Sequence, residues 1–179
     1  MTLLEAAAGA VLAHDEGCAT GEIPDCIPTG IDWDGAGAGT TDEEARVVYG
    51  KACDQSVGEA CLVLGFMLME GQGGDADAAA ARDVFDLACS AGEMYGCLQL
   101  GILWHEGEGG REDTTVARGY YDAACTGDLP EGCFMLGAMW DAGVGGDQDT
   151  KTALDLLEKA CRGGVMDACS YYQSIVGEN

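Results

Sequence analysis

The residues with the most evident chemical potential in this chain are its ten cysteines, which follow a strict spacing. The two members of each pair are eight residues apart, and successive pairs recur at intervals of 35 or 36 residues. An even, regularly spaced set favours disulfides and an oxidising compartment, whereas a cytosolic chain more often uses cysteines for metal. The pairs are Cys18/Cys26, Cys53/Cys61, Cys89/Cys97, Cys125/Cys133 and Cys161/Cys169.

Metal and cofactor sites have little support in the sequence. No Cys-x-x-Cys occurs, and the two histidines, His14 and His105, do not recur with the cysteines as zinc ligands would. The Asp75-x-Asp77 and Asp147-x-Asp149 pairs lack the ligand loop and the closing glutamate of a calcium site. We therefore expect these aspartates to serve as helix caps, and we expect no metal or cofactor.

The charge of the chain restricts its partners. Thirty-two Asp and Glu residues against eight Lys and Arg give a formal charge of −24, which repels nucleic acid and anionic membrane surfaces. No apolar run reaches the length of a membrane span, so no membrane insertion is expected. The acidity fits either a solvated surface or attraction of a basic partner, and the sequence leaves both open. A monomer is expected.

The elements that must position the cysteines repeat with the same period of 36 residues, which is typical of a stacked repeat array. In three copies an apolar helix follows the second cysteine and ends at a glycine, and a Gly-rich loop leads to an aspartate that can cap the next helix. The glycines are Gly71, Gly107 and Gly143, and the aspartates are Asp77, Asp113 and Asp149. A capping box, Thr41-Asp-Glu-Glu44, opens an earlier helix.

Each apolar helix has a glycine at its centre, at Gly65, Gly101 and Gly137, where glycine normally costs about 1 kcal/mol relative to alanine. Close contact with a second helix would explain it, through Ala81, Ala117 and Ala153 on the partner helices. Leucines and tryptophans are expected to fill the core between the helices, at Leu64, Leu100, Leu136 and at Leu68, Trp104, Trp140. The prediction is an all-α fold, an α/α superhelical solenoid of stacked helix hairpins.

The cysteine spacing also predicts where the disulfides lie. Eight residues within one helix would separate the sulfurs by about 12 Å, which is too far to bond. Each pair must therefore span the corner between two helices, with Gly92, Gly127 or Gly163 in the turn. Every bridge would link one hairpin to the next.

The whole chain, 1–179, is expected to form one repeat domain. Residues 1–52 would hold an N-terminal helix over 2–14 and a degenerate capping repeat, residues 53–169 the regular repeats, and residues 170–179 a C-terminal capping helix and tail. The N-terminus is a poor signal peptide, because it lacks a basic segment and contains Glu5. A leader removed before Met1 would reconcile this with the extracellular or periplasmic location that disulfides favour.

The repeated pattern resembles the Sel1-like repeat family, relatives of the tetratricopeptide repeats. It consists of Leu-Gly-x-x-Trp or Leu, then Gly-x-Gly-Gly, Asp, Ala and a closing Ala-Cys. The eight-residue cysteine spacing is similar to that of its cysteine-rich secreted bacterial members. The resemblance implies a right-handed superhelix that acts in protein–protein interaction and is usually exported when disulfide-rich. Trp104 and Trp140 stand where the family commonly has tyrosine, and the copy around Cys26 is irregular.

Some cysteine-rich members of that family resemble penicillin-binding or β-lactamase-like proteins, which makes a hydrolase an alternative hypothesis. A serine acylase would need Ser-x-x-Lys, but no serine of this chain has lysine at the third position after it. His105 has no nucleophile motif beside it. We therefore assign no catalytic residue and expect no enzyme.

A partner-binding surface is predicted on the first helix of each repeat, at positions one, five and eight after the cysteine, which share one face. Their identities vary from copy to copy, which favours an apolar concave groove with acidic surroundings over a core position. Packing between successive repeats is the alternative. The groove would bind a segment of another protein, and its acidic surroundings favour a basic one. An inhibitor or immunity protein for a basic toxin is a second hypothesis. The nine positions are Leu62, Phe66, Met69, Leu98, Ile102, His105, Phe134, Ala138 and Asp141.

Overall fold

The computed structural model describes residues 41–177, and helices make up most of this part of the chain. The predicted helix over 2–14, the Cys18/Cys26 pair and most of the capping repeat lie outside the described residues, as do residues 178–179. The helices are α2 (Asp42–Asp54), α3 (Gly58–Glu70), α4 (Ala78–Ser90), α5 (Met94–Glu106), α6 (Thr114–Thr126), α7 (Pro130–Ala142), α8 (Thr150–Arg162) and α9 (Met166–Gly177).

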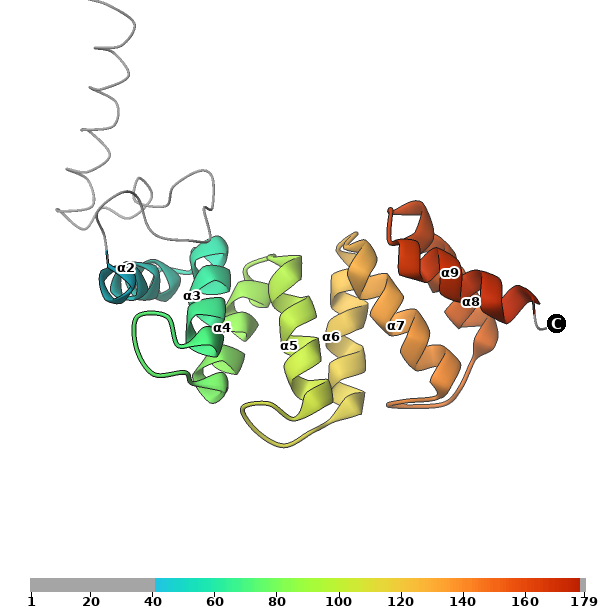
Figure 1. The fold of residues 1–179 in the computed structure, drawn as a ribbon, viewed down its shortest axis with the longest axis horizontal. Helices are drawn as coiled ribbons and strands as arrows, with labels where there is room; N and C mark the ends of the chain where they lie inside the picture. The colour runs from blue at the N-terminus through green and yellow to red at the C-terminus, as the bar shows by residue number, and fades with distance from the viewer. Residues whose placement is uncertain (1–40, 178–179) are drawn as a thin grey trace, which may run out of the picture.

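The helices stack in chain order into a curved array, in which each packs against the one before it and the one after it (Figure 1). The hairpins α3–α4, α5–α6 and α7–α8 form the three regular copies, and long loops join the two helices of each. A repeat of this kind buries its apolar surface mainly against its neighbours, so the core runs along the array instead of gathering at one centre. The predicted all-α solenoid of disulfide-linked hairpins is confirmed.

Local capping explains where the helices begin and end. Asp77, Asp113 and Asp149 each accept hydrogen bonds from the first-turn backbone, and Thr41 and Glu44 form the reciprocal capping box. The Thr152 hydroxyl in particular lowers the pKa of Asp149, because it donates to the ionised carboxylate. The first helices of the copies end in glycines with φ of 71°, 75° and 65°, namely Gly71, Gly107 and Gly143.

The corners between hairpins turn through one left-handed residue at a fixed position of the repeat. That position is occupied by Ser56, Gly92, Asp128 and Gly164, with φ of 64°, 95°, 62° and 99°. All three predicted glycines lie in these turns, but only Gly92 is the left-handed residue, because Gly127 and Gly163 precede it and have φ of −77° and −74°. Their small size serves packing instead, because a Cβ at either one would meet Met94 or Pro130 at the start of a preceding helix.

Four disulfides bridge these corners. They join the last turn of one hairpin to the first turn of the next, with Cα–Cα distances of 4.4 to 4.7 Å. The second cysteines of the three regular copies are at most 1% exposed, so the bridges lie inside the core. The pairs are Cys53–Cys61, Cys89–Cys97, Cys125–Cys133 and Cys161–Cys169. The fifth pair, Cys18–Cys26, remains a prediction.

The central glycines make room for a large side chain. A Cβ at Gly101 would come within 2.6 Å of the Tyr121 ring, and one at Gly65 would overlap the ring of Phe85. The predicted close contact with Ala81, Ala117 and Ala153 is therefore only part of the explanation. The side chain that requires glycine lies one turn further along the second helix, at Phe85, Tyr121 and Leu157, all fully buried.

The six leucine and tryptophan residues of the predicted core differ in how deeply they are buried. Leu68, Leu100 and Leu136 are buried, whereas Leu64, Trp104 and Trp140 are half-buried. The two tryptophans instead have an arginine over their rings.

Replacing Gly101 by alanine should destabilise the protein by about 1–3 kcal/mol, because the added methyl overlaps the buried Tyr121 ring. The matched control is Gly50→Ala in α2, where a Cβ would have no neighbouring atom within 4 Å. That change should stabilise by about 1 kcal/mol through helix propensity alone. Urea unfolding of the oxidised proteins measures both. Stabilisation by Gly101→Ala of the same size as by Gly50→Ala would contradict the packing explanation.

Candidate functional site

A row of arginines, one per repeat, connects each hairpin to the loop of the next. Arg46, Arg82 and Arg118 are 36 residues apart and lie on α2, α4 and α6. Arg46 donates to the carbonyl oxygens of Gln72 and Asp75 at 3.4 and 3.1 Å. A single guanidinium can satisfy several loop carbonyls because its donors are fixed in a planar fork.

Arg82 makes the same connection one repeat later and is only 8% exposed. It donates to the carbonyl of Leu103 at 2.5 Å and to that of Arg111 at 3.3 Å, and its guanidinium carbon lies 4.3 Å from the centre of the Trp104 ring. Arg111 occupies the repeat position of Asp75, so the two arginines use equivalent loop acceptors.

Glycines allow the loops to approach these arginines closely. A Cβ at Gly73, Gly109 or Gly145 would overlap the backbone carbonyl at the start of α2, α4 or α6. These three glycines have φ of 69°, 72° and 72°, a left-handed conformation that other residues rarely adopt. The Gly-rich loops therefore hold successive repeats together.

Arg118 departs from this pattern. Its guanidinium carbon stacks 3.4 Å from the centre of the Trp140 ring, closer than its counterpart in the preceding repeat. Within residues 41–177, however, no carbonyl or side chain accepts a hydrogen bond from it. The equivalent loop acceptor would be the carbonyl of Asp147. Arg118 thus retains donors that the other two arginines use inside the protein.

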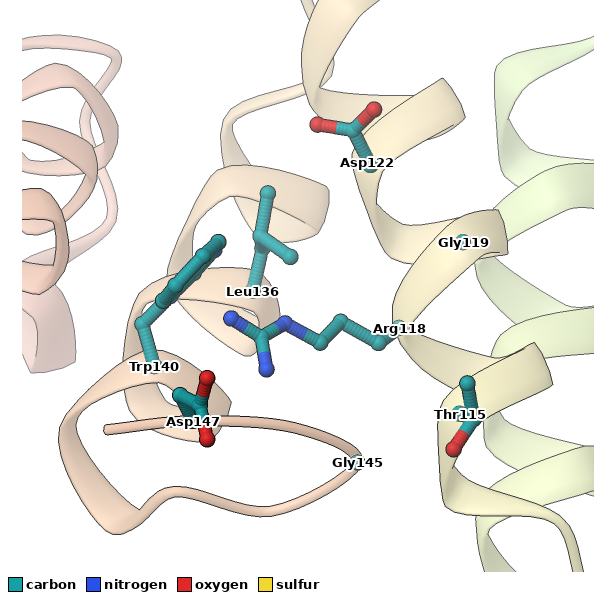
Figure 2. A pocket seen from close by; sticks show the side chains of 8 residues that line it. All are labelled: Thr115, Arg118, Gly119, Asp122, Leu136, Trp140, Gly145 and Asp147. Carbon is teal, nitrogen blue, oxygen red and sulfur yellow. The ribbon is translucent and has the colours of Figure 1, made fainter. Parts of the chain in front are cut away.

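A pocket of about 430 Å³ opens at this place, between α6, α7 and the loop before α8. Figure 2 shows the Arg118 side chain crossing it towards Trp140, with Asp122 to one side and Asp147 to the other. Gly119 contributes to the opening, because a Cβ there would have no neighbour within 4 Å. The lining residues are Thr115, Arg118, Gly119, Asp122, Leu136, Trp140, Gly145 and Asp147.

The two carboxylates of the pocket are unpaired within the described part of the chain. Neither Asp122 nor Asp147 has a hydrogen-bond or ion-pair partner there. One repeat earlier, the aspartate equivalent to Asp122 is Asp86, which accepts a hydrogen bond of 3.1 Å from the Tyr120 hydroxyl. The residue equivalent to Tyr120 is Leu156, which has no hydroxyl to donate to Asp122. One guanidinium and two carboxylates give the pocket a formal charge of −1.

The nine residues predicted to form a partner groove lie outside this pocket. Leu62 and Leu98 are 8% and 7% exposed and belong to the core, so the structure favours packing between repeats for these two. The others are half-buried: Phe66, Met69, Ile102, His105, Phe134, Ala138 and Asp141.

Several of the half-buried residues have partners in the fold. Phe66 packs edge-on against Phe85 with ring centroids 5.3 Å apart, and Phe134 packs against the cluster around Tyr121. Asp141 accepts a hydrogen bond of 2.7 Å from the Tyr171 hydroxyl, which raises the pKa of Tyr171 and ties α9 to α7. These contacts leave the groove itself a proposal.

His105 and Tyr121 each place a polar atom in the interior. The Nδ1 atom of His105 and the hydroxyl of Tyr121 are buried without a hydrogen-bond partner in the described residues. Burial, with a further contribution from Glu106, raises the pKa of Tyr121, so its hydroxyl stays neutral at ordinary pH. Within the same range no group of three or more metal-ligating side chains is assembled, and no helix is long and apolar enough to span a membrane.

The pocket was missed by the sequence analysis, although two signals for it were present. The arginines recur at the period of the cysteines, and Trp104 and Trp140 recur with them. Neither signal reveals that Arg118 lacks the loop hydrogen bonds of Arg82, because that depends on the position of a loop in the neighbouring repeat.

The fold and its regular corners define an α-helical repeat protein built from helix hairpins. Comparison with protein families gives the same class, since the Sel1 repeat model matches residues 58–93, 95–129 and 130–165. The chain therefore belongs to the Sel1 repeat family. A search of curated proteins finds no match.

Solved structures include several similar proteins. Cysteine rich protein B of Helicobacter pylori is 30% identical with a TM-score of 0.59, over 75% of this chain and 99% of that one. A protective antigen of uropathogenic Escherichia coli strains with an SLR fold and a Sel1 repeat protein from Oxalobacter formigenes are each 21% identical, with TM-scores of 0.87 and 0.78. They match 94% and 90% of this chain, which spans 36% and 65% of their lengths.

Replacing Arg82 by methionine should destabilise the protein by about 2 kcal/mol more than replacing Arg118, the matched position one repeat later. Both changes remove a cation–π contact, but only the first also removes hydrogen bonds from a charged donor to the main-chain carbonyls of Leu103 in α5 and Arg111 in the loop. Urea unfolding of the two oxidised variants measures the difference. Equal losses of stability would show that Arg118 is as firmly bonded inside the protein as Arg82.

Proposed function

We propose that this protein is a scaffold that binds a segment of another protein outside the cytoplasm. The observation that carries the proposal is the run of three matched repeats over 58–165, because Sel1 repeat proteins generally act as scaffolds for protein–protein interaction. A stacked helical array offers a long continuous surface, and side chains from several repeats can contact one partner.

The disulfides support an extracellular or periplasmic location. Bridges at four successive corners, in a chain whose described part has no free cysteine, match the usage of proteins that fold in oxidising compartments. Reducing conditions would remove a constraint from every corner at once.

The charge supports a partner with a basic surface. A formal charge of −24 accelerates encounter with a positively charged protein and makes the association rate fall with added salt. The same charge favours, as a second candidate, an inhibitor or immunity-type protein for a basic partner. Sel1 repeat folds are typically non-enzymatic, and we assign no catalytic residue to a hydrolase.

The binding surface that we propose is the face formed by the seven predicted groove residues that are half-buried on α3, α5 and α7, namely Phe66, Met69, Ile102, His105, Phe134, Ala138 and Asp141. Ala138, near the middle of α7, is half-buried and has the smallest side chain on this face. A larger side chain at this position would occupy space that a partner segment needs. A partner segment lying along this face would contact one helix from each of three repeats.

Ala138→Arg should weaken capture of the partner at least tenfold if the segment lies across this face. The matched control is Ala123→Arg, an exposed position on α6 that changes the net charge equally. The measurement is affinity capture from a native extracellular or periplasmic fraction, with partners identified by mass spectrometry and then titrated purified. Both variants should fold as the wild type does by circular dichroism. Capture retained equally by all three proteins would overturn the proposed face, and the absence of any saturable partner would overturn the scaffold.

A further inference from the structure

The pocket between α6 and α7 differs from the equivalent places in the other repeats in three independent ways. Arg118 has donors that no group in the described residues accepts, Gly119 leaves space beside it, and two aspartates are unpaired. In the preceding repeats the position of Gly119 is occupied by larger residues, Val47 and Asp83, whose side chains are exposed. Among the three arginines of this row in the described residues, Arg118 is the one that lacks a hydrogen-bond acceptor and is followed by glycine.

The hydrogen bonds of the other arginines indicate what Arg118 would bind. Arg46 and Arg82 donate to main-chain carbonyl oxygens of the neighbouring loop at 3.1 to 3.4 Å, and Arg82 also donates to the carbonyl of Leu103 in the last turn of α5. A main-chain carbonyl from another molecule would supply the same kind of acceptor at Arg118. A carboxylate of another molecule could also accept hydrogen bonds from Arg118. However, Asp122, Asp147 and the overall charge of −24 would repel a further anion.

The carboxylates of Asp122 and Asp147 indicate the charge of the side chain that the bound segment would place in the pocket. With one guanidinium and two carboxylates, the pocket gains charge balance when it receives one positive group. Leu136 and Trp140 provide apolar surface for a methylene chain, and the volume of about 430 Å³ accommodates a side chain of this length.

We propose that this pocket binds a peptide segment through a main-chain carbonyl at Arg118 and a lysine or arginine side chain at Asp122 and Asp147. The inference rests on the proposed scaffold function and names the chemistry of its partner. It places a basic anchor residue at the junction of the second and third regular copies, apart from the face proposed for α3, α5 and α7.

The test uses the full oxidised chain and capped tripeptides, acetyl-Ala-X-Ala-amide, with X as lysine, arginine, glutamine or glutamate. Binding is followed by the indole N–H signal of Trp140, one of three tryptophans in the chain, in nitrogen-15 NMR titrations. Lysine and arginine peptides should bind at least fivefold more tightly than the glutamine peptide, and the glutamate peptide more weakly still.

Three variants locate the interaction. Asp122→Asn with Asp147→Asn should reduce the preference for lysine over glutamine to less than twofold, whereas Asp54→Asn with Asp83→Asn, two exposed aspartates outside the pocket, should preserve it. Gly119→Val, which places in α6 the residue found at position 47, should weaken every peptide about tenfold while leaving the fold intact.

Tighter binding of the glutamate peptide would overturn the proposal in favour of an anion site at Arg118. No shift of the Trp140 signal with any peptide, or equal loss of the lysine preference in both aspartate double variants, would also overturn it. These outcomes are separate from the capture experiment, because a partner captured through Ala138 would leave the scaffold standing while the pocket proposal fell.

Discussion

The constraint on which the rest of this structure depends is the covalent corner between consecutive hairpins. Each corner contains one residue with a left-handed backbone conformation and a disulfide between two cysteines that are eight residues apart. At the third corner these are Asp128 and the Cys125–Cys133 bridge. A helix pair of this size cannot bury its apolar faces alone, so it is stable only when the next pair stacks against it. The bridge limits the orientations available to the next pair before that packing forms.

Packing and hydrogen bonds then complete the contact between repeats at its other end. The corner lies at one end of the helices, while the Gly-rich loop and its arginine lie at the opposite end, as Arg82 and Gly109 illustrate. A repeat held at both ends has little freedom to pivot against its neighbour. The exception at Arg118 is informative for this reason, since the loop glycines Gly145 and Gly146 still lie against α6 but the arginine makes no hydrogen bond to the loop where the pocket opens.

Much of the fold could be predicted because its signals are local in sequence. Asp77 and Gly71 specify helix ends through neighbouring backbone groups, and the spacing of Cys53 and Cys61 excludes a bridge within one helix. Contacts between elements were harder to foresee. The partner of Gly65 is the ring of Phe85, one turn beyond the expected alanine, and the corner at Asp128 turns on a residue that is not glycine.

The candidate site was less predictable than the fold. Variation among the copies suggested that Leu62 and Leu98 were surface residues, but a position can vary and still be buried when each repeat packs against a different neighbour. The pocket at Arg118 differs from its counterparts because this arginine makes no hydrogen bond to the loop. No sequence pattern indicates that such a hydrogen bond is missing.

Native-state hydrogen exchange on a variant lacking one corner bridge, Cys125→Ala with Cys133→Ala, tests the role of the corners most directly. Loss of this disulfide should lower protection about 30- to 160-fold in α6 and α7, in line with about 2–3 kcal/mol for a short loop, and much less in α3 and α4. Unchanged protection in α6 and α7, or an equal loss in all the helices, would contradict the account of locally locked repeats.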